Sequence, residues 1–97
     1  MRGVVFTKAA RAELLEAQDW YEAEAPGLGR RLRAEIDYTV KRIAQNPLQF
    51  PVVHKTLCRA RVRRFPYGLF FTLTDDAAVV VACFHGSRDP NRWQERV

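Results

Sequence analysis

The hydrophobic positions of the N-terminal segment follow first a strand pattern and then a helical one. Val4, Val5 and Phe6 form a short β-branched and aromatic run, which is typical of a strand. Thr7 follows as the expected N-cap of a helix that opens at Lys8, because a threonine hydroxyl can accept from the free N–H groups of a first helical turn. The sequence therefore predicts a strand that leads directly into a helix.

Two amphipathic helices are predicted to form a hairpin. Apolar residues recur at helical spacing in two successive sets, Ala10, Leu14, Ala17 and Tyr21, and then Leu28, Leu32, Ile36, Val40 and Ile43. Pro26-Gly27 separates the two sets, and Asn46-Pro47 ends the second, because proline cannot donate a helical hydrogen bond. The short connection favours antiparallel packing of the two helices.

The hydrophobic period changes to two near residue 58. Residues 49–57 are expected to form a loop that crosses back to the sheet. The stretch CRARVR at residues 58–63 alternates apolar residues with arginines, which predicts a strand with one buried side and one solvent-facing side. Phe65-Pro66 marks the end of that strand.

Two further strands and a short helix complete the pattern. Residues 67–74 and 77–84 are predicted to be strands joined by a tight turn, and the second is apolar on both faces, as a central strand is. Asp89-Pro90 is expected to begin a short helix that runs through Trp93.

The predicted fold is a single α+β domain over residues 1–97. It consists of an N-terminal strand, an α-helical hairpin, a three-stranded antiparallel meander and a short C-terminal helix, with the helices packed on one face of a small sheet. A chain of 97 residues can bury one modest core. The other sheet face is left partly open, and the arginines of residues 58–63 are expected to look out from it or from its rim.

The whole chain has a formal net charge of +5, and most of this charge lies in its C-terminal half. Residues 1–48 hold eight basic and seven acidic side chains, whereas residues 49–97 hold eight basic and four acidic ones. Such a surface attracts nucleic acid, anionic membrane or an acidic protein segment, and charge alone does not choose among them. No run approaches the roughly 18 apolar residues of a membrane span, and there is no signal-peptide layout, so a cytoplasmic protein is expected.

Few residues are placed for enzymatic chemistry. The sequence has no serine in a nucleophile elbow and no glycine-rich phosphate loop. Cys58 and Cys83 lie among apolar residues and are interpreted as core thiols, with a disulfide or a reactive thiol as the alternatives. His54 and His85 are single and wrongly spaced for a zinc site, so neither a metal nor another cofactor is expected.

Three kinds of residue allow both a functional and a structural interpretation. The arginines of the C-terminal half could stabilise charge on a phosphoryl group during RNA cleavage, but a basic docking surface is favoured. His85 could transfer protons, but a hydrogen-bonded histidine that closes an apolar strand is favoured. Trp93 could stack on a nucleobase, but anchoring of the last helix to the core is favoured.

The C-terminal motifs resemble those of the RelE/ParE superfamily of bacterial toxins. The resemblance lies in Arg-Arg-Phe-Pro-Tyr at residues 63–67, the aromatic strand after it, the valines at 79–81, and His-Gly-Ser-Arg-Asp at 85–89, ending near Trp93. The N-terminal strand and helical hairpin fit the same order, so the resemblance spans nearly the whole chain. It implies a toxin from a two-gene toxin-antitoxin module of the plasmid-stabilisation kind, neutralised by an antitoxin whose C-terminal segment wraps over it.

The superfamily contains two target classes. RelE-like members cut messenger RNA on the ribosome, and ParE-like members inhibit DNA gyrase. The resemblance places Arg59, Arg61 and Arg88 on basic residues of the RelE-like enzymes. Gly68, however, stands where those enzymes hold an arginine, and Trp93 lies near the position of their terminal tyrosine. An indole does not titrate in the useful range, so it cannot replace a phenol in proton transfer.

The ParE-like interpretation therefore leads. It implies a growth-arresting toxin that inhibits gyrase through protein contact, with a set of partner-binding residues comprising Arg59, Arg61, Arg63, Arg64, Arg88 and Trp93. A hetero-oligomer with the antitoxin is expected, in which the antitoxin segment lies in the groove between the helical hairpin and the sheet and over the basic strand. No membrane partner is expected.

Two other functions stay open at the level of sequence. One is a ribosome-dependent mRNA endonuclease that holds the scissile phosphate with Arg59, Arg61 and Arg88. The other is a family member that has lost toxicity and kept antitoxin binding.

Overall fold

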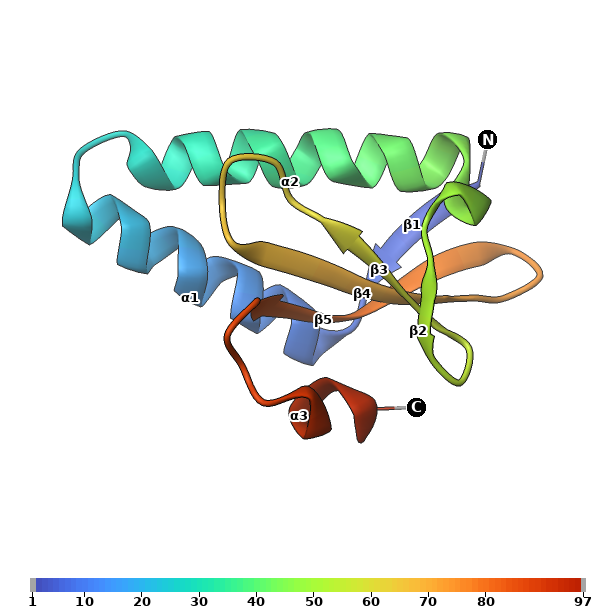
Figure 1. Cartoon of the computed structure of the whole chain (residues 1–97). Helices are drawn as coiled ribbons and strands as arrows, with labels where there is room; N and C mark the ends of the chain where they lie inside the picture. Colours follow the sequence, from blue (N-terminus) through green and yellow to red (C-terminus); the bar gives the residue numbers. More distant parts are fainter. Residues whose placement is uncertain (1, 97) are drawn as a thin grey trace.

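A hairpin of two helices covers one face of a five-stranded sheet in the computed structural model of the protein, which describes residues 2–96 (Figure 1). The elements in chain order are β1 (Gly3–Phe6), α1 (Lys8–Glu24), α2 (Leu28–Gln45), the 3-10 turn η1 (Pro47–Gln49), β2 (Val52–His54), β3 (Leu57–Arg61), β4 (Tyr67–Leu73), β5 (Ala77–His85) and α3 (Pro90–Gln94). The α+β order predicted from the sequence is confirmed. No helix within residues 2–96 is both long and apolar enough to cross a membrane.

The sheet has the strand order β1-β5-β4-β3-β2. β1 runs parallel to β5, and all other neighbours are antiparallel, so the predicted meander is formed by β3, β4 and β5. The structure corrects the prediction of a loop at residues 49–57, because β2 lies inside that range and pairs with β3. Three residues are too few to show a period of two, and Pro51 directly before them marks an edge strand whose hydrophobic pattern is weak.

Local side-chain contacts set where the helices begin and turn. The predicted N-cap is confirmed, since the Thr7 hydroxyl accepts a hydrogen bond from the backbone N–H of Ala10 at 3.1 Å. At the turn between the helices Gly27 has a φ of +87°, which favours glycine. The Glu22 carboxylate accepts from the backbone N–H groups of Gly27 and Gly29 at 2.8 and 3.0 Å, and these bonds lower the pKa of Glu22. The acidic side chain thus orders the hairpin turn.

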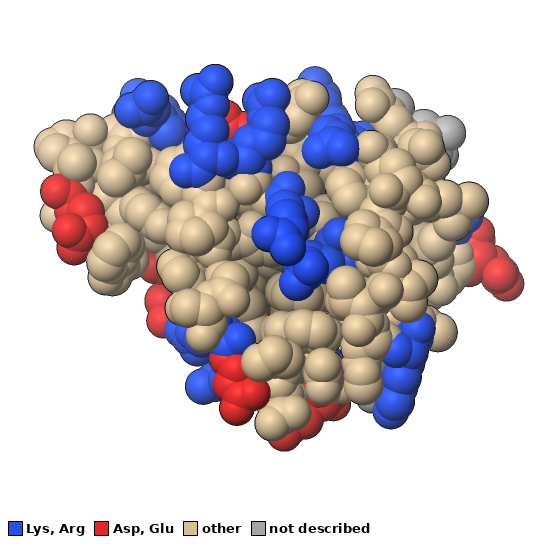
Figure 2. Space-filling view, viewed as in Figure 1, with Lys and Arg blue, Asp and Glu red and all other residues tan. Residues whose placement is uncertain are grey.

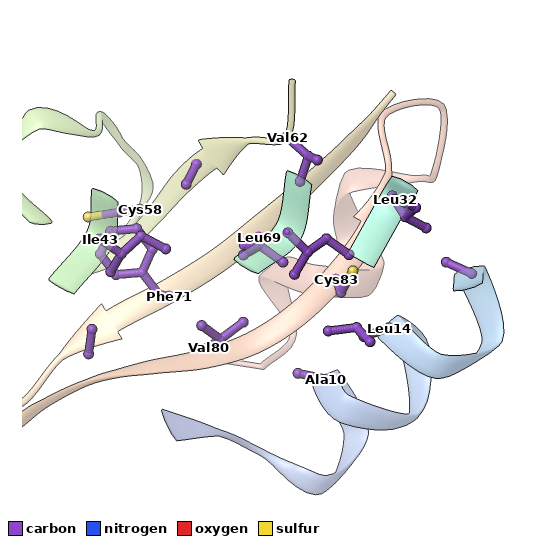
Figure 3. Packing of buried hydrophobic residues seen from close by; sticks show 14 residues of the cluster. Ala10, Leu14, Leu32, Ile43, Cys58, Val62, Leu69, Phe71, Val80 and Cys83 are labelled. Carbon is purple, nitrogen blue, oxygen red and sulfur yellow. The ribbon is translucent and has the colours of Figure 1, made fainter. Parts of the chain in front are cut away.

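The main core lies between the helical hairpin and the sheet (Figure 3). It contains Ala10 and Leu14 of α1, Leu32 and Ile43 of α2, and the residues that the strands turn toward the helices, Cys58, Ala60, Leu69, Phe71, Val80 and Cys83. All of them are buried, as the predicted apolar stripes of both helices require. The helical periodicity of the sequence is therefore explained by this single contact layer.

A smaller apolar cluster lies on the opposite face of the sheet. Its buried members are Leu57, Phe70, Val81, Ala82, Phe84 and Trp93. The Trp93 ring stacks on Phe70 at 4.4 Å between centroids and an angle of 19°, which fixes α3 against the sheet. Asp89 caps that helix by accepting from the backbone N–H of Asn91 at 3.0 Å. The prediction that Trp93 anchors the last helix is confirmed, so part of this sheet face is covered and part stays open.

An ion pair joins α1, β5 and the C-terminal segment at the edge of β5. β1 pairs only with residues 77–80 of β5, which leaves the later part of that edge without a neighbouring strand in the described chain. Glu13 accepts from the Cys83 backbone N–H at 3.0 Å and pairs with Arg96 at 2.6 Å. Arg96 also donates to the Val81 carbonyl at 2.8 Å. Two side chains therefore replace the hydrogen bonds that a strand would make here.

Removal of the Glu13 carboxylate is expected to destabilise the fold. Glu13→Ala leaves the Cys83 N–H and the Arg96 guanidinium without their acceptor, which should cost about 2 kcal/mol of unfolding free energy. Urea unfolding followed by circular dichroism measures this change. The matched control is Asp37→Ala, which breaks the exposed Arg33–Asp37 pair and should cost less than about 0.5 kcal/mol. Equal effects of the two substitutions would contradict the assigned role of Glu13.

Candidate binding surface

The arginines of the predicted basic strand separate into two groups. In β3 the expected alternation holds, because Cys58 and Ala60 are buried under the helices while Arg59 and Arg61 lie on the opposite face. The strand ends at Arg61 rather than at residue 63, and the chain then turns, with Arg64 at a φ of +68°. The expectation that Arg63 continues the row of Arg59 and Arg61 is therefore wrong. An alternating sequence cannot show where a turn interrupts the strand.

Arg63 and Arg64 turn instead toward α2. The Arg63 guanidinium lies 3.1 Å from the Glu35 carboxylate and 4.0 Å from the centroid of the Tyr38 ring. Arg64 lies 4.0 Å from the same carboxylate. Figure 2 shows basic side chains gathered along the upper part of this face, over α2, and others at its centre, over the sheet. The basic surface thus has a helical part that is partly neutralised by Glu35 and a separate part on the sheet.

The sheet part surrounds a cavity of about 290 Å³, which we call the arginine pocket. Its lining includes Arg59 and Arg61 of β3, Arg88 from the turn after β5, and an aromatic floor of Phe70 and Trp93. The structure therefore brings together four of the six residues predicted to bind partners, from three elements far apart in the sequence. Trp93 is only 7% exposed, so it contributes an edge of the floor and not a free stacking surface.

Arg59 lies over Gly68 of the neighbouring strand. A Cβ atom at position 68 would stand 3.4 Å from the Arg59 Cγ and 3.6 Å from its Cδ, so the Arg59 stem packs closely over the Gly68 backbone. The Arg59 Nε is buried and makes no hydrogen bond within the described residues. Leaving such a donor unpaired costs about 1–3 kcal/mol, so an acceptor brought by a partner would gain by satisfying it.

His85 orders the turn that carries Arg88. Its Nδ1 accepts from the Ser87 backbone N–H at 3.0 Å and lies 2.8 Å from the Ser87 hydroxyl. The ring also meets Tyr67 edge-on at 5.3 Å between centroids. These contacts agree with the structural interpretation of this histidine, because the nitrogen nearest the backbone is already used as an acceptor.

A second and larger hollow of about 480 Å³ lies between α1 and the end of β5, and we call it the α1–β5 cleft. One wall is formed by Glu16, Trp20 and Tyr21 of α1, and the other by Arg88 and Arg92. Trp20 is 57% exposed, which is unusual for so large an apolar side chain. The sequence analysis did not assign Trp20 or Arg92 to a site. The sequence holds one signal for Trp20: it lies beside the apolar stripe of α1 and not on it, which indicates a large apolar side chain exposed to solvent.

Within residues 2–96 the structure contains no cluster of three His, Cys, Asp or Glu side chains that could hold a metal ion. The side chains that line the arginine pocket and the α1–β5 cleft are mainly arginines and aromatic residues.

The architecture and the basic surface can be compared with known proteins. Residues 4–90 match the protein family described as "ParE toxin of type II toxin-antitoxin system, parDE". The chain belongs to the ParE toxin family. A relative named Toxin ParE2 from Mycobacterium tuberculosis is 32% identical over 86 residues, which cover 88% of this chain and 82% of that protein. The superfamily resemblance seen in the sequence is confirmed, and this ParE-family protein is a toxin of a type II toxin-antitoxin system.

Solved structures show the same fold as this ParE-family toxin. The chromosomal ParDE system from P. aeruginosa superposes with a TM-score of 0.71 at 21% identity, covering 88% of this chain and 96% of the other. The E. coli DinJ-YafQ complex superposes with a TM-score of 0.60 at 14% identity, covering 90% and 96% of the two chains. At these identities the likeness establishes the arrangement of helices and strands.

Both thiols of this ParE-family toxin are free and buried, and they are expected to be unreactive. Burial, with the nearby Glu13, raises the pKa of Cys83 to about 12, and burial also raises the pKa of Cys58. Because the thiolate is the reactive form, neither thiol should react with a disulfide reagent at pH 8 until the protein is unfolded in urea. Rapid reaction of one thiol in the folded protein would instead support the alternative of a reactive cysteine.

The same burial predicts how stability depends on pH. In the unfolded chain the Cys83 thiol ionises near its ordinary pKa of 9.0, whereas in the folded protein it ionises only near 12. The unfolded state therefore loses its proton first, and the free energy of unfolding should fall as pH rises from 9 toward 12. Cys83→Ala should make this fall shallower in urea unfolding curves measured across that range, and an unchanged slope would contradict the assignment.

Proposed function

We propose that this ParE-family toxin arrests bacterial growth by binding DNA gyrase, and that a cognate antitoxin neutralises it by covering the binding surface. The observation that carries the proposal is the family match over residues 4–90, which spans the helical hairpin and the sheet from Val4 of β1 to the end of β5. The toxin acts through contact with its target and not through bond-making chemistry of its own.

The composition of the arginine pocket supports binding over catalysis. Cleavage of RNA needs groups that take up and release a proton near neutral pH. The pocket instead offers the guanidinium groups of Arg59, Arg61 and Arg88 and the buried indole of Trp93, which are hydrogen-bond donors without an acceptor. The Nδ1 of His85 is held by Ser87. Such a set can attract and orient an acidic surface, which is what recognition of a protein partner requires.

The surface also suits an acidic antitoxin segment. Arg88 lines both the arginine pocket and the α1–β5 cleft, so a segment that leaves the cleft past Arg88 would reach the pocket directly. The cleft lies between α1 of the helical hairpin and β5 of the sheet, and the antitoxin groove was predicted between the hairpin and the sheet. A flexible acidic segment that orders on contact would satisfy exposed cations and strand-edge groups together.

The gyrase proposal is tested with the purified toxin. Free toxin should inhibit DNA supercoiling by gyrase and increase the yield of gyrase-linked DNA breaks. Arg61→Glu should weaken this inhibition by about tenfold, because it reverses an exposed charge in the arginine pocket. Lys41→Glu, which reverses an exposed charge on α2, is the control that should retain inhibition. Full supercoiling activity in the presence of a folded toxin would exclude gyrase as the target.

A second candidate function, a ribosome-dependent mRNA endonuclease, is favoured by one observation. Arg59, Arg61 and Arg88 face a single pocket, and the Arg59 Nε has no partner within the described chain, as expected of a site that receives a phosphate. Mapping of transcript ends after expression without antitoxin distinguishes the two functions. Cuts within codons that disappear in Arg61→Ala and Arg88→Ala would support the endonuclease, whereas intact transcripts with broken DNA support the gyrase inhibitor. Normal growth with neither cut transcripts nor broken DNA would indicate a family member that has lost toxicity and retains only antitoxin binding.

A further inference from the structure

One side of α2 carries a stripe of polar residues that faces the turn after β3. The stripe recurs at spacings of four, three and four residues and comprises Arg31, Glu35, Tyr38 and Arg42. Its two ends are eleven residues apart, which is close to three full turns of an α-helix with about 3.6 residues each. Arg31 and Arg42 therefore lie on the same side of α2, about 16 Å apart along the helix axis.

The turn after β3 adds two more arginines to this stripe. Arg63 and Arg64 lie 3.1 and 4.0 Å from the Glu35 carboxylate. Arg64 also lines a hollow together with Arg31, and its side chain is 73% exposed, so it is open to a partner. The helix and the turn thus form one cationic surface, which we call the basic ridge and which consists of Arg31, Arg42, Arg63 and Arg64.

Positive charge on the basic ridge exceeds the negative charge beside it. Glu35 is only 14% exposed and already meets two arginines. Asp37 is the other acidic residue of α2, and it pairs with Arg33 at 3.2 Å. Arg33 also lies 3.5 Å from Gln18 of α1, so this pair is on the opposite flank of the helix. Four arginines against one covered carboxylate leave a net charge of +3, and Figure 2 shows basic side chains over α2 with acidic ones mainly at the margins of the view.

The spacing and type of these cations fit phosphate groups. All four are arginines, whose planar guanidinium can hold two oxygens of one phosphate. Duplex DNA carries one negative charge for about every 1.7 Å of its axis, so a ridge about 16 Å long can meet several phosphates at once. An extended acidic peptide, in contrast, places a side chain on the same side only about every 7 Å. A nucleic acid therefore matches the ridge better than a protein segment does.

The aromatic side chain of the stripe favours a duplex over a single strand. Proteins that bind single strands stack the bases on exposed aromatic rings. The Arg63 guanidinium lies over the Tyr38 ring, 4.0 Å from its centroid, so this ring is covered and is not free to stack on a base. Contacts to the backbone of a duplex need only charge and hydrogen-bond donors, which the basic ridge supplies.

We propose that the basic ridge binds the phosphate backbone of duplex DNA without reading its sequence. The choice of DNA rests on the proposed function, because gyrase acts on duplex DNA. The ridge holds the toxin on the DNA beside its protein target, and the arginine pocket on the sheet contacts the protein. The two parts of the basic surface thus have different partners.

Binding of a fluorescently labelled DNA duplex to the free toxin, measured by anisotropy at increasing salt, tests the proposal. The logarithm of the association constant should fall with the logarithm of the salt concentration with a slope of about −3 to −4, because each neutralised phosphate contributes about −0.9. Arg31→Gln and Arg64→Gln should each make the slope shallower by about 0.9, and the double variant by about 1.8. Thermal melting establishes that each variant is folded.

Arg33→Gln is the matched control. It removes the same charge from the same helix, but on the flank that faces α1, so the slope should stay at the parent value. Equal changes of slope in Arg33→Gln and Arg64→Gln would contradict a site on the basic ridge. A folded toxin that does not bind the duplex at about 50 mM salt would overturn the proposal altogether.

Unlabelled competitors test the choice of partner. Single-stranded DNA of the same length should displace the labelled duplex about tenfold less well, because the ridge offers no free ring for stacking at Tyr38. Equal displacement by a single strand, by duplex RNA or by polyglutamate would assign the ridge to that polymer and overturn the assignment to duplex DNA.

The supercoiling assay separates this inference from the proposed function. A toxin that inhibits gyrase but does not bind the free duplex would overturn DNA binding by the ridge and support gyrase as the target. A toxin that binds the duplex with the expected slope but leaves supercoiling intact would exclude gyrase and support DNA binding by the ridge.

Discussion

Burial of β5 on both faces is the constraint from which the arrangement of the other elements follows. Val81, Ala82, Cys83 and Phe84 are all buried, with Cys83 facing the helical hairpin and Phe84 facing α3. A strand that is apolar on both sides needs a cover on each side, and a chain of this length has few elements to supply them. The long hairpin covers one face of β5. The five-residue helix α3, held by one tryptophan, covers only part of the other, and the uncovered part is where the arginines lie.

The sequence predicted most of the elements because their signals are local. Helical spacing, the Thr7 cap and the Pro26-Gly27 turn each depend on residues close together in the chain, and each is present in the structure. What could not be predicted depends on contacts between distant residues. Glu13 resembles any solvated acid on an amphipathic helix, yet it meets Cys83 and Arg96, 70 and 83 residues away.

The candidate surface was predicted in the same uneven way. Alternation in the strand placed Arg59 and Arg61 on one side, but only the turn at Arg64 decides that Arg63 reaches back to Glu35. The α1–β5 cleft depends on the register of β1 along β5, which pairs residues more than 70 positions apart and has no local signal in the sequence. The surface as a whole follows a simple physical division. Its charges act over a distance, whereas its backbone edge and aromatic walls act only on contact.

The packing of Arg59 over Gly68 has a consequence for how this surface can change over generations. The Arg59 stem lies within van der Waals reach of any side chain at 68, and residues in contact are energetically coupled. An arginine introduced at 68 would lie against the Arg59 stem, so what a further cation adds to the pocket would depend on how Arg59 repacks. Substitutions at 59 and 68 are therefore expected to be epistatic, since the effect of a side chain at one position depends on the residue that stands at the other.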